Sequence, residues 1–406
     1  MKKYLALLSA ALLAFSCIYP YEPEGVPSVD EVVVFDGDLV IGAVNTIRVS
    51  TLQPLQEDSN SPYDIFPRLL CYGKLTVEDS SGKVYNGAWA GSDTFMVDLT
   101  AGSEDLQYRF TYTLDPVTAG LHVNMPNVLD HLQDPTVHTY QTPWLEVRKA
   151  PGIDGIQYEA DNVNLSFDVS LTGKDEDSRY YRWGFVETWE FHADFAPEYY
   201  YDRLTGKYGT YPLGYVSPQY YCWTSAVSRQ SSLFTTEGLT ENRVKREPFH
   251  TVSRTSRRLQ EMYRLELVAK GISREGYMFH RTLQQNSNST GDLFSANPSE
   301  LRGNITRLEN EGELVLGFIE AMTVTRAQIY VGNLYYKGTT PWYNVFIPDT
   351  SEDGMPLDMW YDNGYRPAAT PPDSLPGYYW AMHRCIDCTL DGGSKTKPEG
   401  WPTSHE

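Results

Sequence analysis

Short stretches in which apolar and polar side chains alternate recur along this chain, and they constrain its fold more than any other feature. Residues 45–52 place Ile47 and Val49 on one side, and residues 108–114 alternate in the same way. Successive side chains of a strand point to opposite faces, so this pattern is typical of sheets with one buried face. Residues 79–82 (Asp-Ser-Ser-Gly) then supply the turn of a hairpin. We therefore expect a mainly β protein.

The turn signals divide the chain into three regions. Residues 29–150 read as several short strands without a helical stretch, which predicts a β-sandwich of immunoglobulin-like size. Residues 151–340 predict a second, fibronectin-like sandwich, with a short helix over residues 273–286 inserted between its strands. Residues 341–406 contain nine of the 25 prolines and predict an irregular C-terminal arm over the body.

The first seventeen residues have the form of a bacterial lipoprotein signal. Residues 1–16 combine a basic start with a mostly apolar stretch of 12 residues, which is too short to span a bilayer. The stretch ends at Ser16-Cys17, so we expect residues 1–16 to be removed and the Cys17 thiol to carry acyl chains such as palmitate. The alternative is an ordinary secretory signal cut near Ser16, because Ala14 stands where the usual lipobox has leucine.

Residues 17–28 predict an extended tether behind this anchor. Three prolines in this stretch disfavour a packed element. Glu22 and Glu24 lie close to the lipidated cysteine and favour onward export to the cell surface. We therefore expect a protein of the outer membrane that is lipid-anchored and faces the cell exterior.

The charge of the chain disfavours one class of function, and the length of its apolar runs excludes another. The formal net charge is −20, and removing Lys2 and Lys3 with the signal would make it −22. Such a polyanion repels phosphate backbones, so we expect no nucleic-acid partner. No apolar run reaches the roughly 20 residues that a spanning helix needs, so integral membrane transport is excluded as well.

Four cysteines follow Cys17 and are disulfide candidates in an exported chain, namely Cys71, Cys222, Cys385 and Cys388. They allow three pairings, and the sequence does not choose among them. A bridge from Cys222 to either C-terminal cysteine would close a loop of over 160 residues. The CxxC of residues 385–388 could also act as a redox pair or as half of a zinc site, although its Pro/Gly-rich flanks favour a structural bridge.

No residue pattern nominates catalysis. The chain lacks GxSxG, HExxH, GxGxxG and P-loop motifs, and its eight histidines have no metal-ligand spacing. The best carboxylate pair is Glu187 and Glu190, but residues three apart on a strand face opposite sides. We therefore expect a non-enzymatic protein without a cofactor or metal, in which these carboxylates lie on a solvated or ion-paired strand.

Aromatic clusters supply the candidate ligand-binding residues. Tyrosine occurs 30 times, and exposed aromatic rings can stack on sugars or anchor a protein partner. The clusters in irregular segments favour a surface role, and we select from them Tyr200, Trp342, Tyr343, Tyr378 and Trp380. The alternative is that these rings fill sandwich cores.

A basic stretch lies within this acidic chain, comprising Arg243, Lys245, Arg246, Arg254, Arg257, Arg258 and Arg264. A solvated strand face is the simplest interpretation. The alternative is contact with acidic lipid headgroups or an acidic partner.

A series of motifs in a fixed order connects this chain with a known family. The motifs occupy residues 34–37, 180–190, 222–223, 290–294, 298–299, 303–305, 315–318, 385–388, 392–393 and 397–401. In this order they resemble the Bacteroidota lipoprotein family called domain of unknown function 4249, over nearly the whole mature chain. Cys71 and the sequence before Cys17 depart from the family pattern.

The resemblance implies an outer-membrane lipoprotein of a family without an established activity, often encoded near TonB-dependent transporters. Our first hypothesis is a surface lipoprotein that binds a ligand or partner as an accessory to such a transporter. The second is a carbohydrate-binding or adhesive surface module, for which the partner is a glycan.

Overall fold

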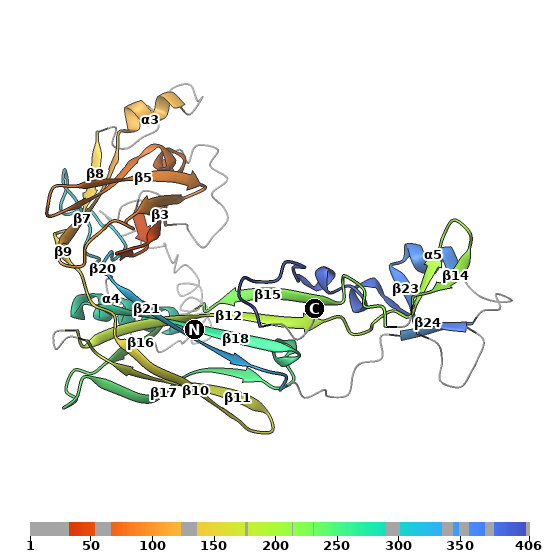
Figure 1. The fold of residues 1–406 in the computed structure, drawn as a ribbon. Helices are drawn as coiled ribbons and strands as arrows, with labels where there is room; N and C mark the ends of the chain where they lie inside the picture. The colour runs from red at the N-terminus through yellow and green to blue at the C-terminus, as the bar shows by residue number, and fades with distance from the viewer. Residues whose placement is uncertain are drawn as a thin grey trace, which may run out of the picture.

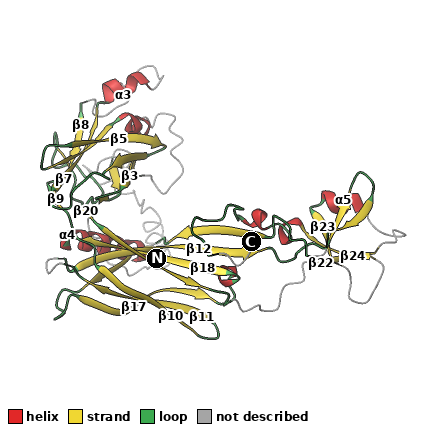
Figure 2. Cartoon of the chain, viewed as in Figure 1, coloured by secondary structure: helices red, strands yellow, loops and turns green. Residues whose placement is uncertain are grey.

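The computed structural model describes residues 32–52, 66–122, 136–174, 178–212, 214–229, 231–289, 301–334, 344–348, 357–369 and 377–402. Strands predominate among them, which confirms the expected mainly β class (Figure 2). Figure 1 shows a first β unit at the upper left, a second below it, and a smaller third unit at the right.

The first unit is a sheet that folds over on itself into two layers. Its strands run in the order β1 (Val33–Asp36), β3 (Val44–Thr51), β6 (Thr94–Asp98), β5 (Val84–Gly91), β4 (Lys74–Asp79), β7 (Gln107–Leu114), β8 (His138–Gln141) and β19 (Thr306–Arg307), with β9 (Leu145–Glu146) beside β7. The ring of Phe35 in β1 lies 5.5 Å from Phe110 and 5.4 Å from Tyr140, so β1 packs across the core from β7 and β8. The β4–β5 pairing confirms the hairpin predicted around residues 79–82.

The second unit is a sandwich of two separate sheets. One sheet has the order β10 (Gly152–Ala160), β11 (Asn164–Thr172), β17 (Arg243–Ser253); the other has β15 (Tyr221–Val227), β12 (Tyr180–His192), β18 (Met262–Ile272), β21 (Val324–Val331), with β16 (Ser232–Thr235) on β12. Phe167 of β11 and Tyr263 of β18 lie 5.8 Å apart in the core between the sheets. When β15 and β16, which both pair with β12, are counted together as strand C′, this unit has the A-B-E and C′-C-F-G arrangement of a fibronectin-like sandwich.

A long insertion separates the last two strands of this sandwich. It begins with helix α4 (Arg274–Ser289), which confirms the helix predicted over residues 273–286. The Ser273 hydroxyl caps it by accepting the Gly276 N–H at 2.9 Å. Residues 301–322, expected within the second region, then return to the first unit before β21 begins.

Backbone hydrogen bonds attach this returning segment to the first unit. Phe35 N–H donates to the Leu316 carbonyl at 2.8 Å, and Leu39 N–H donates to the Glu320 carbonyl at 2.8 Å. The strands β2 (Leu39–Val40) and β20 (Ala321–Met322) pair in parallel. Leu316 forms only a single bridge, with Val34, where the sequence suggests a strand over residues 314–319. The insertion therefore links the two units through main-chain contacts.

Glycine is required where the insertion folds over itself. A Cβ atom on Gly303 would lie 1.6 Å from the Gly317 carbonyl oxygen, and one on Gly317 would lie 2.2 Å from the Phe35 carbonyl oxygen. Gly317 also has a φ of 126°, which L side chains rarely adopt. These close approaches let three backbone segments meet at one point.

The third unit is built from two distant parts of the chain. The hairpin β13 (Tyr199–Asp202) and β14 (Lys207–Thr210) packs against β23 (Tyr365–Ala369), beside which lie β24 (Gly377–Met382), β22 (Asn344–Pro348) and α5 (Leu357–Asp362). The C-terminal arm, expected to be irregular, therefore contains a three-stranded sheet. Its proline-rich sequence contains short strands, and the β13–β14 hairpin packs against one of them, β23.

Short helices complete the described part of the chain, namely α2 (Phe66–Leu69), α3 (Pro116–His122) and 3-10 turns at Leu70–Tyr72, Arg257–Leu259, His383–Cys385 and Cys388–Asp391.

We predict that Gly303→Ala destabilises the protein by at least about 2 kcal/mol, because the new methyl group would overlap backbone that cannot rotate away. Denaturant unfolding, with limited proteolysis of the 301–322 segment, measures the effect. Gly332→Ala is the control, since a Cβ there meets nothing within 4 Å. Equal stability of the two variants would contradict the account of the close approach.

Candidate functional site

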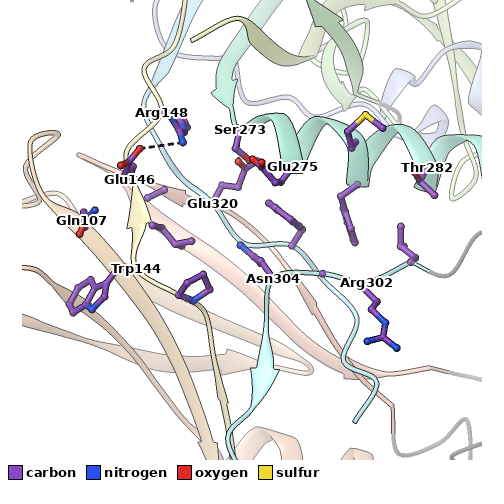
Figure 3. Close-up of a pocket in the computed structure, with 18 residues that line it drawn as sticks. Gln107, Trp144, Glu146, Arg148, Ser273, Glu275, Thr282, Arg302, Asn304 and Glu320 are labelled. Atoms are coloured by element: carbon purple, nitrogen blue, oxygen red, sulfur yellow. Dashed lines mark hydrogen bonds and ion pairs between the residues drawn. The ribbon is translucent and has the colours of Figure 1, made fainter. Parts of the chain in front are cut away.

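A pocket of about 710 Å³ lies where the insertion meets the first unit. Figure 3 shows its 18 lining residues, which come from the edge of the first sheet, from helix α4 and from the returning segment. Cavities of this size hold small molecules, and such sites are common at the junctions of structural units. The pocket is therefore the candidate site for a ligand.

Aromatic side chains give the pocket its apolar surface. Trp144 enters from the segment before β9, Phe279 from α4, and Phe318 from the returning segment. The Phe279 and Phe318 rings lie 5.3 Å apart, so the helix and the segment hold each other in place. The Arg109 guanidinium lies 4.6 Å from the centre of the Trp144 ring and is ion-paired with Glu78 at 2.6 Å.

Several polar groups of the lining already have partners within the chain. Arg148 pairs with Glu146 at 3.3 Å, as the dashed line in Figure 3 shows. Asn304 donates to the Ile319 carbonyl at 2.7 Å and accepts the Ile319 N–H at 2.9 Å. These contacts hold the shape of the site.

Glu320 is the unusual polar residue of the lining. Only 4% of its surface is exposed, and its Oε1 accepts the Ser273 N–H at 2.7 Å, at the start of α4. Its Oε2 is buried and has no hydrogen-bond partner among the described residues. Burial raises the pKa of Glu320 to about 7, against the lowering effect of the hydrogen bonds from Ser273. A buried carboxyl with a spare acceptor is suited to binding a donor.

A glycine in α4 makes room for this carboxyl. A Cβ on Gly276 would lie 2.2 Å from the Glu320 Oε2, so the carboxyl occupies the space that a side chain would fill. Glycine in a helix costs roughly 1 kcal/mol relative to alanine. Gly276 therefore weakens the helix, but it leaves the space in which the Glu320 carboxyl packs against the first turn of α4.

A cluster of charges joins the units beside Glu320. Asp38, after β1, accepts hydrogen bonds from Arg182 of β12 and from Lys270 of β18, the latter at 2.6 Å. Burial opposes the charge of Asp38, but these two cations hold its pKa at about 2. The imidazole of His280, on α4, lies 2.7 Å from Arg182, and burial together with that cation lowers its pKa to about 4.

The structure separates the aromatic residues selected from the sequence. Trp380 is fully buried, and its indole N–H donates to the Tyr208 hydroxyl at 3.2 Å, so the prediction that it lies on a binding surface is corrected: it is a core residue of the third unit. Tyr378 is half-buried and stacks on Tyr208 at 3.9 Å. Trp342 and Tyr343 lie outside the described residues.

Tyr200 is exposed and belongs to a row of tyrosines on the third unit. Its ring lies 5.2 Å from Tyr211, which stacks at 4.5 Å on Tyr215 with nearly parallel planes. Tyr200 is 45% and Tyr215 40% exposed. This row lies in the unit at the right of Figure 1, whereas the pocket lies by α4 and β9 at the left.

The cysteines form one disulfide, between Cys222 and Cys388, which closes a loop over 166 residues, as the sequence allows. Cys71 and Cys385 are free, so their selection as disulfide candidates was wrong. Cys71 lies in the first unit, whereas Cys385 packs against Ala368 of β23 and Ala381 of β24 in the third unit. The CxxC is therefore not a dithiol pair. Cys17 lies outside the described residues.

The carboxylates Glu187 and Glu190 are both buried, at 4% and 1% exposure. Burial alone would raise the pKa of Glu187, but hydrogen bonds from His250 and Tyr263 hold it below its usual value. Glu190 accepts the indole N–H of Trp401 at 3.1 Å. The two carboxylates thus have different partners, and both are buried. Of the two predicted alternatives, this favours an ion-paired strand over a solvated one.

The basic stretch is held by partners within the chain. Arg246 pairs with Asp168 at 2.8 Å, Arg257 with Asp391 at 2.5 Å. The remaining members contact Asp154 (Arg243), Glu241 (Lys245), backbone carbonyls (Arg254), Glu187 (Arg258) and Thr188 (Arg264). This pairing favours a structural role for the stretch.

Among the described residues, no group of three His, Cys, Asp or Glu side chains has the arrangement of a metal site. No helix in that part of the chain is long and apolar enough to cross a membrane.

Two joined β units with an aromatic-lined pocket at their junction define this molecule as a mainly β protein of the sandwich type. The chain belongs to the family described as a domain of unknown function, DUF4249, whose model matches residues 18–328. No curated protein matches the chain. The family match ends within β21 of the second unit, so it includes every residue that lines the pocket.

Sequence reasoning found the helix and its cap but missed the pocket. Nothing in the sequence around Glu320 indicates that it is buried at a pocket, because a single glutamate between apolar residues is typical of many strands. The useful signal was Gly276, which weakens a helix that is otherwise well formed. A glycine there indicates that another group approaches the helix closely.

Replacing Glu320 with glutamine is predicted to remove a pH dependence of stability. The folded pKa of about 7 exceeds the unfolded value of 4.5, so the protonated carboxyl favours folding below pH 4.5 and this contribution is lost as the pH rises through 7. Relative to Glu320→Gln, the wild-type protein should lose up to about 3 kcal/mol of unfolding free energy between pH 4.5 and 7.5.

Denaturant midpoints at four or five pH values measure this difference. His280 and Asp38 titrate in both proteins, so their contributions cancel in the comparison. Parallel pH profiles for the two proteins would show that Glu320 does not titrate in this range.

Proposed function

We propose that this protein is a non-enzymatic lipoprotein of the bacterial outer membrane, held by acylated Cys17 with its folded part at the cell exterior. In this proposal it captures a small ligand in the pocket between its first two units and acts as an accessory to a TonB-dependent transporter. The sequence around Cys17, the acidic tether and the family match support the location. The pocket supports the role in binding.

The pocket is the observation that carries the proposal. Its walls combine aromatic rings with a buried carboxyl that lacks one partner, which are the elements of a ligand site. Its residues come from both units, so a bound ligand would contact both at once.

The carboxyls of the described chain support binding more than catalysis. The Oε1 of Glu320 accepts a hydrogen bond from the Ser273 backbone N–H. Among the described residues, no titratable side chain hydrogen-bonds to its Oε2. Glu187 is fixed by Arg258 and Tyr263 inside the second unit. We therefore assign no catalytic residue.

The anchor and the partner can be tested together in intact cells. We predict that wild-type protein incorporates labelled palmitate and crosslinks to a β-barrel transporter, whereas Cys17→Ser loses the label and leaves the membrane fraction. Cys71→Ser is the matched control, because Cys71 is a free thiol of the folded part. An unlabelled wild type that fractionates like Cys17→Ser would overturn the anchor, and anchored protein without a crosslinked transporter would overturn the accessory role.

The exposed tyrosine row favours a second candidate function, a carbohydrate-binding or adhesive module. Tyr200 and Tyr215 offer ring surface to solvent, and the stacked Tyr211 holds Tyr215 in place. Aromatic rings held in this way provide flat, rigid contact area for a sugar.

We predict that Tyr200→Ala and Tyr215→Ala each reduce binding on a glycan array at least tenfold if this second function holds. Tyr158→Ala is the control, since Tyr158 is 41% exposed but lies on the second unit. Glycan binding that survives both substitutions, or its absence from the wild type, would argue against a sugar site on the third unit.

A further inference from the structure

The pocket chemistry identifies a class of ligand, and this inference rests on the proposed ligand-binding function. We infer that the pocket binds a small organic amine whose apolar or aromatic body lies against Trp144, Phe279 and Phe318, with its ammonium group directed to Glu320. The three rings and the carboxyl all belong to the lining of one cavity.

The aromatic rings favour a cation over an anion. The face of an aromatic ring carries negative electrostatic potential and attracts an ammonium group. The rings of Phe279 and Phe318 lie 5.3 Å apart with their planes tilted by 35°, so they pack on each other and form one aromatic wall. A cavity of about 710 Å³ has space for a ring-sized body beside them.

The unpartnered oxygen of Glu320 supplies the polar end. Its Oε2 is buried without a hydrogen bond, and a buried acceptor without a partner is stabilised when a donor binds to it. An ammonium group carries three donors and can satisfy this oxygen while the Oε1 keeps the Ser273 N–H.

The remaining charges of the lining favour the same ligand. Three glutamates and two arginines line the pocket; Arg148 pairs with Glu146, which leaves Glu320 and Glu275 against Arg302. Glu275 is exposed in the first turn of α4 and adds a second carboxyl near the cavity. The whole chain has a formal charge of −20, which attracts cations and repels organic anions.

Protonation of Glu320 couples binding to pH. The charged groups that act on its carboxyl are Asp38, before β2, and Arg182 of β12. Lys270 pairs with Asp38, His280 of α4 contacts Arg182, and the charged side chains that share the pocket lining are Glu146, Arg148, Glu275 and Arg302. Asp38, with a pKa of about 2, stays charged and His280, with a pKa of about 4, stays neutral between pH 6 and 8. Glu320, with its pKa of about 7, changes charge in this range, so amine affinity should rise about tenfold from pH 6 to pH 8.

Calorimetric titration of the detergent-purified full chain tests the inference with three probes of one size, phenethylamine, phenethyl alcohol and 3-phenylpropionate. We expect phenethylamine to bind at least tenfold more tightly than the alcohol at pH 8, and the carboxylate not to bind. Glu320→Gln should lower the amine affinity at least tenfold and remove its pH dependence. Phe318→Ala should weaken the amine and the alcohol alike.

Glu241→Gln is the matched control, because it makes the same chemical change at a side chain that is 72% exposed on the second unit. Denaturant unfolding of each variant shows whether it is folded, and Phe279→Leu gives a second, milder change of the same wall. Equal binding of all three probes, tighter binding of the carboxylate, or amine binding that Glu320→Gln leaves unchanged would overturn the inference.

The result is separable from the proposed function. If the protein carries labelled palmitate and crosslinks to the transporter but does not prefer amines, the inferred ligand class is wrong and the proposed lipoprotein role stands. If the protein binds amines selectively but carries no lipid and crosslinks to no transporter, the inferred ligand class stands and the proposed location and partner are wrong.

Discussion

Main-chain hydrogen bonds between residues 316–322 and residues 33–41 are the interaction on which the rest of this structure depends. The segment that makes them belongs to the connection between β18 and β21 of the second unit, yet it completes the edge of the first. Hydrogen bonds between backbone groups fix distance and direction, so the two units meet in one arrangement. The glycine contact between Gly303 and Gly317 allows the backbones to come close enough for this to happen.

The pocket follows from that crossing. Helix α4 leaves the second unit and the returning chain enters the first, so the space between them is enclosed on three sides by β9, α4 and residues 301–304. The same geometry places the Glu320 carboxyl at the start of α4. There it accepts the Ser273 N–H and fills the space beside Gly276, which has no side chain. The Asp38 cluster beside it adds ion pairs between the two units, and burial makes those pairs stronger than surface pairs.

The third unit shows how far local sequence patterns can mislead. Residues 341–406 carry so many turn-forming residues that an irregular arm was the natural prediction, yet β22, β23 and β24 form a sheet there. The β13–β14 hairpin packs on that sheet through Tyr208, which contacts Tyr378 and Trp380 about 170 residues further along the chain. The Cys222–Cys388 disulfide adds a covalent link between β15 of the second unit and the 3-10 turn at Cys388–Asp391. Trp380 was predicted to be a surface residue because sequence alone does not show which rings a partner strand will cover.

The amino-acid sequence by itself determined the mainly β class, the hairpin at residues 79–82, the capped helix after Ser273 and the family, because each of these depends on residues that are neighbours in the chain. Alternation with a period of two, a cap and a turn are local physical preferences, and they hold wherever the segment lies. Only the tertiary structure decided which cysteines join, which aromatic rings are buried, and that residues 301–322 cross to the first unit. Those outcomes depend on contacts between residues far apart in the chain, and the buried Glu320 carboxyl at the pocket arises from such contacts alone.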